Sequence, residues 1–124
     1  MILGLGIDIV EVDRIASSVE KFGGRFLKRI LRPGEIAYCE SHRHSAPHIA
    51  ARFAAKEAIS KALGTGIGAQ LGWQDMEIRR HQSGEPFVVM HDQGLELLEQ
   101  RGARRVLVSL SHTRVYATAV AVLD

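Results

Sequence analysis

The chain has 124 residues, of which 46% are hydrophobic and 24% are charged. This length and composition predict one folded domain over residues 1–124 and exclude a disordered chain. Basic residues exceed acidic ones by only 16 to 14, a formal charge of +2, so the overall charge does not indicate a nucleic-acid partner.

The N-terminal sequence MILGLGIDIVEV is apolar, but it has no basic leader and acidic residues interrupt it. It therefore predicts neither a signal peptide nor a membrane span. The single cysteine, Cys39, allows no intrachain disulfide and does not indicate an oxidising compartment. We expect a cytoplasmic protein that has no membrane partner.

Residues 2–12 predict a strand with apolar residues on both faces, which is typical of a strand buried on both sides. Asp8 is the exception, because an unpaired buried carboxylate costs a large amount of free energy. Gly6, on the same face, leaves room for another group to approach. Two interpretations are equally open from this segment: Asp8 caps a neighbouring turn, or Asp8 binds a metal ion.

The sequence from residue 14 to residue 38 predicts three short helices. Asp13 is expected to cap the first helix, over residues 14–22. A second helix is expected over residues 25–31, and Pro33 is well placed to begin the third.

The first two of these helices contain the only concentrated basic region of the chain. Its basic residues are Arg14, Lys21, Arg25, Lys28, Arg29 and Arg32, against the single acidic residue Glu20. Such a run is usually a solvated helix face, and the alternative is a docking surface for an acidic partner. On the second interpretation, Phe22 and Phe26 are candidate apolar anchors.

The segment HRHSAPH, residues 42–48, contains His42, His44 and His48. An H-x-H pair can bind a metal ion, but no cysteine or carboxylate completes a recognisable ligand set in this segment. We therefore expect a polar loop before the next helix.

The longest helix is expected from about Pro47, which suits a first turn, to Gly64, which suits a helix end. Glu57 and Lys61 are four residues apart, so they lie on one face of this helix. The helix by itself favours an exposed ion pair between them. The alternative is that the carboxylate and the ammonium hold a metal ion and the phosphate that this metal binds.

The remaining segments complete a mixed α and β pattern. The glycine-rich sequence GTGIGAQLG follows a helix rather than a strand, so it predicts a helix-ending loop and not a phosphate-binding motif. Residues 73–91 predict a β-hairpin, and a helix is expected to begin near Asp92. The segments RRVLVSLSH and VYATAVAVL predict two strong strands. His112, at the end of the first, is interpreted as an edge histidine or, less favoured, as a ligand contact.

Three segments stand out together: GIDIVEVDRI at residues 6–15, RFAAKEAISKALGTG at residues 52–66 and VSLSHT at residues 108–113. In this order and spacing, they resemble the holo-[acyl-carrier-protein] synthase family, the small bacterial 4′-phosphopantetheinyl transferases. The resemblance covers essentially the whole chain. It implies an α+β single domain in which an antiparallel sheet packs with a long central helix, and a homotrimer with active sites between subunits.

The resemblance also implies an activity. The family transfers 4′-phosphopantetheine from coenzyme A to a serine of apo acyl carrier protein, an acidic protein, and releases adenosine 3′,5′-bisphosphate. The reaction belongs to fatty acid biosynthesis and uses Mg²⁺. Because the serine nucleophile comes from the partner, this chain needs no catalytic serine or cysteine.

By this resemblance Asp8 and Glu57 are the metal ligands, and Lys61 completes the catalytic set at the reacting phosphate. The residues expected near coenzyme A are Arg52, Lys61, Gly64, Ser111 and His112. The residues expected to dock the carrier protein are Arg14, Lys21, Arg25 and Phe26.

Two other functions compete with this one. A different Mg²⁺-dependent enzyme acting on a nucleotide phosphate ester would use Asp8, Glu57 and Lys61 but would need no protein-docking face. An RNA-binding module would need exposed aromatic residues in basic surroundings. Aromatic residues make up only 6% of the chain and lie mostly in apolar patterns, which disfavours RNA binding.

Overall fold

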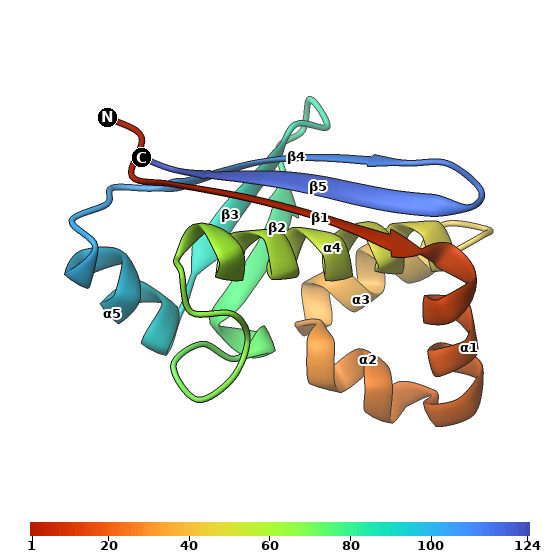
Figure 1. The fold of residues 1–124 in the computed structure, drawn as a ribbon. Coiled ribbons are helices and arrows are strands. Elements are labelled where there is room, and N and C mark those ends of the chain that lie inside the picture. The colour runs from red at the N-terminus through yellow and green to blue at the C-terminus, as the bar shows by residue number, and fades with distance from the viewer.

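A computed structural model describes residues 1–124, with the long helix α4 (Ala46–Ala62) packed against one face of a three-stranded antiparallel sheet (Figure 1). The sheet has the order β1-β5-β4, with β1 (Gly4–Glu11), β5 (Tyr116–Leu123) and β4 (Val106–His112). The predicted α+β class and the packing of a sheet against a long central helix are confirmed.

The other elements lie around the two ends of α4 (Figure 1). Near its N-terminal end are three helices, α1 (Val12–Phe22), α2 (Gly24–Ile30) and α3 (Pro33–Glu40). The chain then forms the short helix η1 (Trp73–Asp75), the hairpin of β2 (Met76–Arg80) and β3 (Pro86–Met90), and helix α5 (Asp92–Gln100). Each predicted helix and strand is present.

The prediction that Asp13 caps the first helix is wrong. Helix α1 begins at Val12, with Glu11 in the capping position and Asp13 in the first turn. The reason is that β1 runs directly into α1: Glu11 still pairs with Tyr116, and the Val12 amide donates to the Val115 carbonyl over 2.8 Å. Asp13 instead faces the positive end of the helix dipole.

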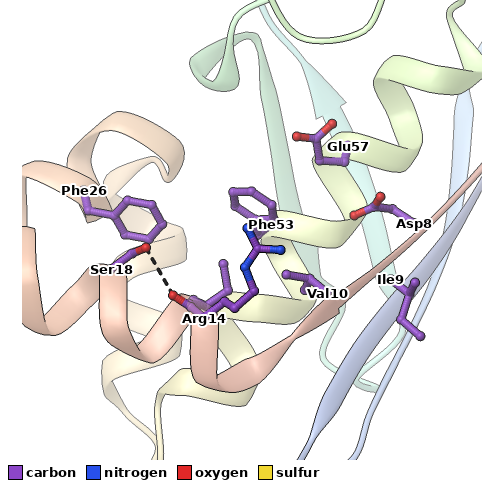
Figure 2. Close-up of a pocket in the computed structure, with 9 residues that line it drawn as sticks. Asp8, Ile9, Val10, Arg14, Ser18, Phe26, Phe53 and Glu57 are labelled. Atoms are coloured by element: carbon purple, nitrogen blue, oxygen red, sulfur yellow. Dashed lines mark hydrogen bonds between the residues drawn. The ribbon is translucent and has the colours of Figure 1, made fainter.

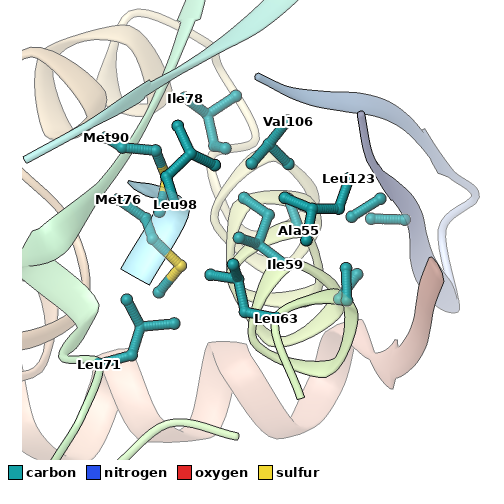
Figure 3. Close-up of a cluster of buried hydrophobic side chains, with 14 of the residues drawn as sticks. Ala55, Ile59, Leu63, Leu71, Met76, Ile78, Met90, Leu98, Val106 and Leu123 are labelled. Carbon is teal, nitrogen blue, oxygen red and sulfur yellow. The ribbon is translucent and has the colours of Figure 1, made fainter. Parts of the chain in front are cut away.

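Helix α4 supplies side chains to both hydrophobic clusters of the protein. The larger cluster has 15 buried residues and lies between α4, the sheet, the hairpin and α5 (Figure 3). The smaller has 10 buried residues and joins the N-terminal half of α4 to α1, α2 and α3. Because α4 is enclosed along most of its length, alanine occupies the positions where neighbouring backbones come closest.

Two glycines allow β1 to cross α4 at backbone contact distance. A Cβ atom at Gly6 would lie 1.9 Å from the Ala58 carbonyl oxygen, and one at Gly4 would lie 2.1 Å from the Ala62 carbonyl oxygen. No side chain fits at either separation, so only glycine permits this crossing. The crossing places Asp8, two residues after Gly6 on the same face of β1, directly beside α4.

A buried ion pair between Lys56 and Glu35 connects α4 to the neighbouring helices and to β2. The Lys56 ammonium donates to Glu35 Oε1 over 2.8 Å and to the Ile30 carbonyl over 2.7 Å, and both charged side chains are 0% exposed. The Glu35 carboxylate also accepts from the Arg32 and Ile78 amides over 2.8 and 2.9 Å. Burial lowers the pKa of Lys56, and Glu35 opposes that change. The pair therefore links α2, α3, α4 and β2.

The expectation that β1 is buried on both faces is wrong for the single chain. Leu5, Ile7 and Ile9 are 67%, 65% and 65% exposed, because α4 covers only the opposite face of the sheet. In the strand register these residues begin three rows across the sheet: Leu5–Val122–Leu107, Ile7–Val120–Ser109 and Ile9–Thr118–Ser111. The uncovered face is therefore apolar along its β1 side. None of the helices has both the length and the apolar composition needed to cross a membrane.

We predict that Gly6→Ala destabilises the fold by about 3 kcal/mol or more, because the new methyl group must push β1 away from α4. Urea denaturation of the purified variant measures this. The matched control is Gly68→Ala, since a Cβ at Gly68 meets nothing within 4 Å. Equal stability of the two variants would contradict the proposed role of Gly6.

Candidate functional site

A cavity of about 380 Å³ lies where β1 passes into α1, next to the middle of α4. Figure 2 shows the carboxylates of Asp8, from β1, and Glu57, from α4, projecting into the same space, with Arg14 reaching in from α1. The apolar part of the wall comes from β1, α1, α2 and α4, through Ile9, Val10, Ile15, Phe26 and Phe53. The cavity therefore combines two carboxylates and one guanidinium with an apolar floor.

Lys61 belongs to the same group of charges. Its ammonium donates to Asp8 Oδ1 over 3.1 Å and to the Ile7 carbonyl over 2.9 Å. The exposed Glu57–Lys61 ion pair that the helix by itself favours does not form, so that prediction is wrong. Lys61 forms its salt bridge with Asp8 on β1 instead. Asp8 is held from the other side, because Thr118 Oγ1 donates to the Asp8 carbonyl over 2.8 Å.

The two carboxylates repel each other electrostatically. Burial raises the pKa of Glu57, the charge of Asp8 raises it further, and Lys61 opposes both effects. Neighbouring carboxylates that repel each other offer the negative charge and hard oxygen atoms that a divalent cation such as Mg²⁺ requires. The chain contains no group of three or more His, Cys, Asp or Glu residues placed to hold a metal ion. Asp8 and Glu57 therefore fit part of a coordination shell that needs further oxygen ligands.

A second groove of about 400 Å³ adjoins this cavity along α1 and α2. It is lined by Ser18, Phe22, Arg25, Phe26 and Arg29, and it shares Ser18 and Phe26 with the carboxylate cavity. The structure thus brings together three of the predicted docking residues, Arg14, Arg25 and Phe26. Lys21, the fourth, lies beside the groove, with its ammonium 5.3 Å from the centre of the Phe22 ring.

The predicted coenzyme A residues do not all meet within one chain. Gly64 lies one turn beyond Lys61 and has a φ of +81°. Ser111 and His112 are exposed at the end of β4, with β5 between them and β1. Arg52 is buried on α4 and stacks on the Tyr38 ring, its guanidinium carbon 4.0 Å from the ring centre.

One group of polar residues was missed at the level of sequence. The rings of His42 and His48 and the guanidinium groups of Arg52 and Arg80 lie around Tyr38, and His48 also meets His112 edge-on. The expectation of a polar loop over residues 42–48 holds only as far as Ser45, because α4 begins at Ala46 and His48 is half-buried in its first turn. The indication in the sequence was the density of histidines. Tyr38 and Arg52 lie within four residues of His42 and His48, whereas Arg80 and His112 come from distant segments.

The comparisons with known proteins agree with this fold and site. A model of the 4′-phosphopantetheinyl transferase superfamily matches residues 4–121. The chain therefore belongs to the 4′-phosphopantetheinyl transferase superfamily. Within it, the chain is 49% identical, over all 124 residues and 99% of the relative, to the holo-[acyl-carrier-protein] synthase of Koribacter versatilis. It is 51% identical to that of Chlamydia trachomatis serovar L2 over 121 residues, 98% of each chain.

Solved structures of holo-[acyl-carrier-protein] synthases have the same fold. That of Neisseria meningitidis matches with a TM-score of 0.92 and 35% identity, covering 100% of this chain and 99% of the other. That of Helicobacter pylori, solved in complex with coenzyme A, matches with a TM-score of 0.87 and 36% identity, covering 97% and 99%. The similarity extends over both chains from end to end.

We predict that Glu57→Gln raises the melting temperature at pH 7 in the presence of a chelator. The folded state raises the pKa of Glu57 above its ordinary value of 4.5, so ionised Glu57 destabilises the fold at neutral pH. Below the ordinary value the carboxyl is protonated in both states, and the advantage of glutamine should disappear near pH 4. Thermal denaturation at the two pH values measures this. Glu96→Gln, at an exposed position of α5, is the control.

Proposed function

We propose that this protein is a holo-[acyl-carrier-protein] synthase. It transfers 4′-phosphopantetheine from coenzyme A to a serine of apo acyl carrier protein and releases adenosine 3′,5′-bisphosphate. The full-length similarity to such synthases supports this function. The single structural observation that carries it is the crossing of β1 over α4, which sets Asp8 and Glu57 on one cavity beside a basic groove, with Lys61 bound to Asp8.

In the proposed mechanism Asp8 and Glu57 hold Mg²⁺, which supplies charge neutralisation and polarisation of the diphosphate when it is bound. Lys61 has three N–H donors, two of which are used by Asp8 and the Ile7 carbonyl. The third is free to donate to a phosphate oxygen, where negative charge develops as the bisphosphate leaves. The serine oxygen forms the new bond to phosphorus and loses its proton to water or to a carboxylate of the site. The bond from that phosphorus to the oxygen of the departing bisphosphate breaks.

The nucleophile of this reaction belongs to the carrier protein and not to this chain. The chain therefore catalyses the transfer mainly by positioning the two substrates and by neutralising charge. We assign coenzyme A to Arg52, Lys61, Gly64, Ser111 and His112. Since β5 separates Ser111 and His112 from the Asp8 strand, one chain does not enclose the donor. We therefore place the active site between subunits, with His112 and Arg52 of one subunit facing the carboxylates of another.

We propose that the assembly is a homotrimer. The support is the open face of the sheet, where Leu5 and Ile7 lie opposite Val122 and Val120, and Ile9 lies opposite Thr118. An exposed apolar patch of this kind, along β1 and the neighbouring part of β5, is typical of a protein–protein interface. Sedimentation equilibrium should give three times the mass of 13.7 kDa. Ile7→Asp should dissociate the assembly, and a stable, active monomer would contradict this proposal.

The partner is an acidic carrier protein, and we assign its docking to Arg14, Lys21, Arg25 and Phe26. Arg25 and Phe26 line the groove, Arg14 lines the adjoining carboxylate cavity and Lys21 lies beside the groove. A carrier bound along this surface presents its serine toward Asp8 and Glu57. Arg29, which lines the same groove, joins the proposed surface. This reaction places the enzyme in fatty acid biosynthesis in the cytoplasm.

The function is tested by a mass measurement. Incubation with coenzyme A, Mg²⁺ and apo carrier protein should add the phosphopantetheine mass to the carrier. Glu57→Gln should slow this transfer by about a hundredfold or more, since it removes one of two metal ligands. Glu96→Gln should leave the rate unchanged. Release of adenosine 3′,5′-bisphosphate without a mass change on the carrier would identify a phosphate-ester hydrolase instead.

We predict that Arg14→Glu raises the carrier concentration needed for half-maximal rate roughly tenfold, because reversal of a docking charge weakens electrostatic attraction. Coenzyme A dependence should change little. Lys61→Ala should instead lower the rate at saturating carrier. Initial rates, titrated separately with carrier and with coenzyme A, make the comparison.

The control for the change in charge is Arg104→Glu, at an exposed residue beside Asp124. Added salt should reduce the rate of the unmodified enzyme at low carrier concentration, since screening weakens long-range attraction. The docking assignment would be contradicted if the carrier concentration for half-maximal rate were unchanged in each of three variants, Arg14→Glu, Lys21→Glu and Arg25→Glu. The basic residues would then form only a solvated helix face.

A further inference from the structure

Helix α2 is too short to be stable by itself. It has 7 residues, and isolated helices shorter than about 12–15 residues are only marginally stable in water. Gly23, which precedes it, makes no side-chain hydrogen bond to its first amides. Three of its side chains line the carboxylate cavity or the adjoining groove, and we call them the docking face: Arg25, Phe26 and Arg29. The orientation of the docking face therefore depends on contacts between α2 and the rest of the fold.

The chain cannot continue α2 beyond Leu31. The Leu31 amide donates to the Leu27 carbonyl over 2.8 Å, but Leu31 itself has extended backbone dihedrals. Pro33, two residues later, lacks the amide hydrogen that a further helical turn would need. The carbonyl groups of residues 28–31 are thus left without a partner inside the helix, as is usual at a helix C-terminus. Donors for them must come from other elements or from water.

A single side-chain amide binds three of these four carbonyls. It belongs to Gln74, which lies in η1, more than forty residues further along the chain. Its Nε2 atom donates over 2.7, 2.9 and 3.4 Å to the carbonyls of Lys28, Leu31 and Arg29. Water could satisfy the same carbonyls, but water would not fix the end of α2 to η1.

Two further side chains join the end of α2 to η1. Arg32 Nη1 donates to the Gln74 carbonyl over 2.7 Å, so the contact is made from both sides. The Lys56 ammonium donates to the fourth carbonyl, that of Ile30, over 2.7 Å and to the Trp73 carbonyl over 3.1 Å. Lys56 is 0% exposed and its loss would leave a buried charge unpaired, whereas Gln74 is exposed. A change at Gln74 therefore alters this junction without disrupting the core.

We infer that Gln74 is a positioning residue for the docking face. It acts through the backbone of α2: its amide fixes the last turn of the helix, and the docking face lies within that turn and the one before it. The inference rests on the proposed function, because that function assigns the carrier protein to this face. Loss of the amide should weaken carrier binding and leave the use of coenzyme A unchanged.

The first test removes the amide donors without a change of charge. Gln74→Met keeps nearly the same side-chain length but has no donor. Calorimetric titration with apo carrier protein should give a dissociation constant raised about fivefold, since neutral hydrogen bonds that hold the docking face are lost. The rate at saturating carrier and the dependence on coenzyme A should stay the same. Gln93→Met, at an exposed glutamine of α5, is the control and should bind the carrier normally.

The second test is amide hydrogen exchange of the free protein, which does not involve the carrier. The amides of residues 27–31 should exchange about tenfold faster in Gln74→Met than in the unmodified protein, because the end of α2 opens more often. The amides of α5 should not change. Gln74→Lys restores donors and places a positive charge at a helix C-terminus, so it should return exchange to the original rate.

Three results would overturn the inference. One is an unchanged affinity for the carrier in Gln74→Met. Another is a weakened affinity with unchanged exchange in α2, because Gln74 would then act on the carrier directly. The third is exchange in Gln74→Lys that stays as fast as in Gln74→Met. The carrier mass measurement is independent: unmodified protein that binds the carrier but transfers nothing refutes only the proposed function, and normal transfer with unchanged affinity in Gln74→Met refutes only this inference.

Discussion

The contact between the backbones of β1 and α4 is the constraint on which the rest of the structure depends. Gly6 and Gly4 allow the strand to lie against the Ala58 and Ala62 carbonyls, and β5 and β4 extend the sheet from β1. Since β1 continues directly into α1, the same contact fixes where the basic helices begin. A carboxylate on β1, a carboxylate on α4 and the basic groove therefore adopt one arrangement without any flexible connection.

The local pattern of the sequence predicted the elements and the main chemical groups of the site. Asp8 was conspicuous because a carboxylate interrupts an apolar strand, and helical spacing put Glu57 and Lys61 on one face. The structure brings all three together, but it pairs Lys61 with Asp8 over 3.1 Å rather than with Glu57. Helical spacing measures only distance along one element. The competing partner came from a strand more than fifty residues away, through a crossing that spacing does not describe.

The burial of a side chain depends on which other elements cover its surface. Alternation of apolar and polar residues along a strand does not show which face is covered. The pattern of β1 correctly grouped Leu5, Ile7 and Ile9 on one face, yet that face is open in the single chain. The helical stripe of α4 includes Arg52 and Lys56, and both are buried, although the family resemblance implied that Arg52 lies near coenzyme A and gave Lys56 no role. Charged residues in register with Ile59 on the inner face were the available indication of buried polar contacts.

The buried pair of Lys56 and Glu35 constrains how this sequence can change over time. Each partner satisfies the other, and together they bind backbone groups from α2, α3 and β2. Loss of one partner leaves an unpaired charge in the interior. This lowers the free energy of unfolding by about 3–5 kcal/mol, a large part of the total stability of a small domain. Replacement of both by apolar residues of similar volume is tolerable, but each single step toward it is not. The two positions form an epistatic pair, and drift at either one is blocked until the other changes with it.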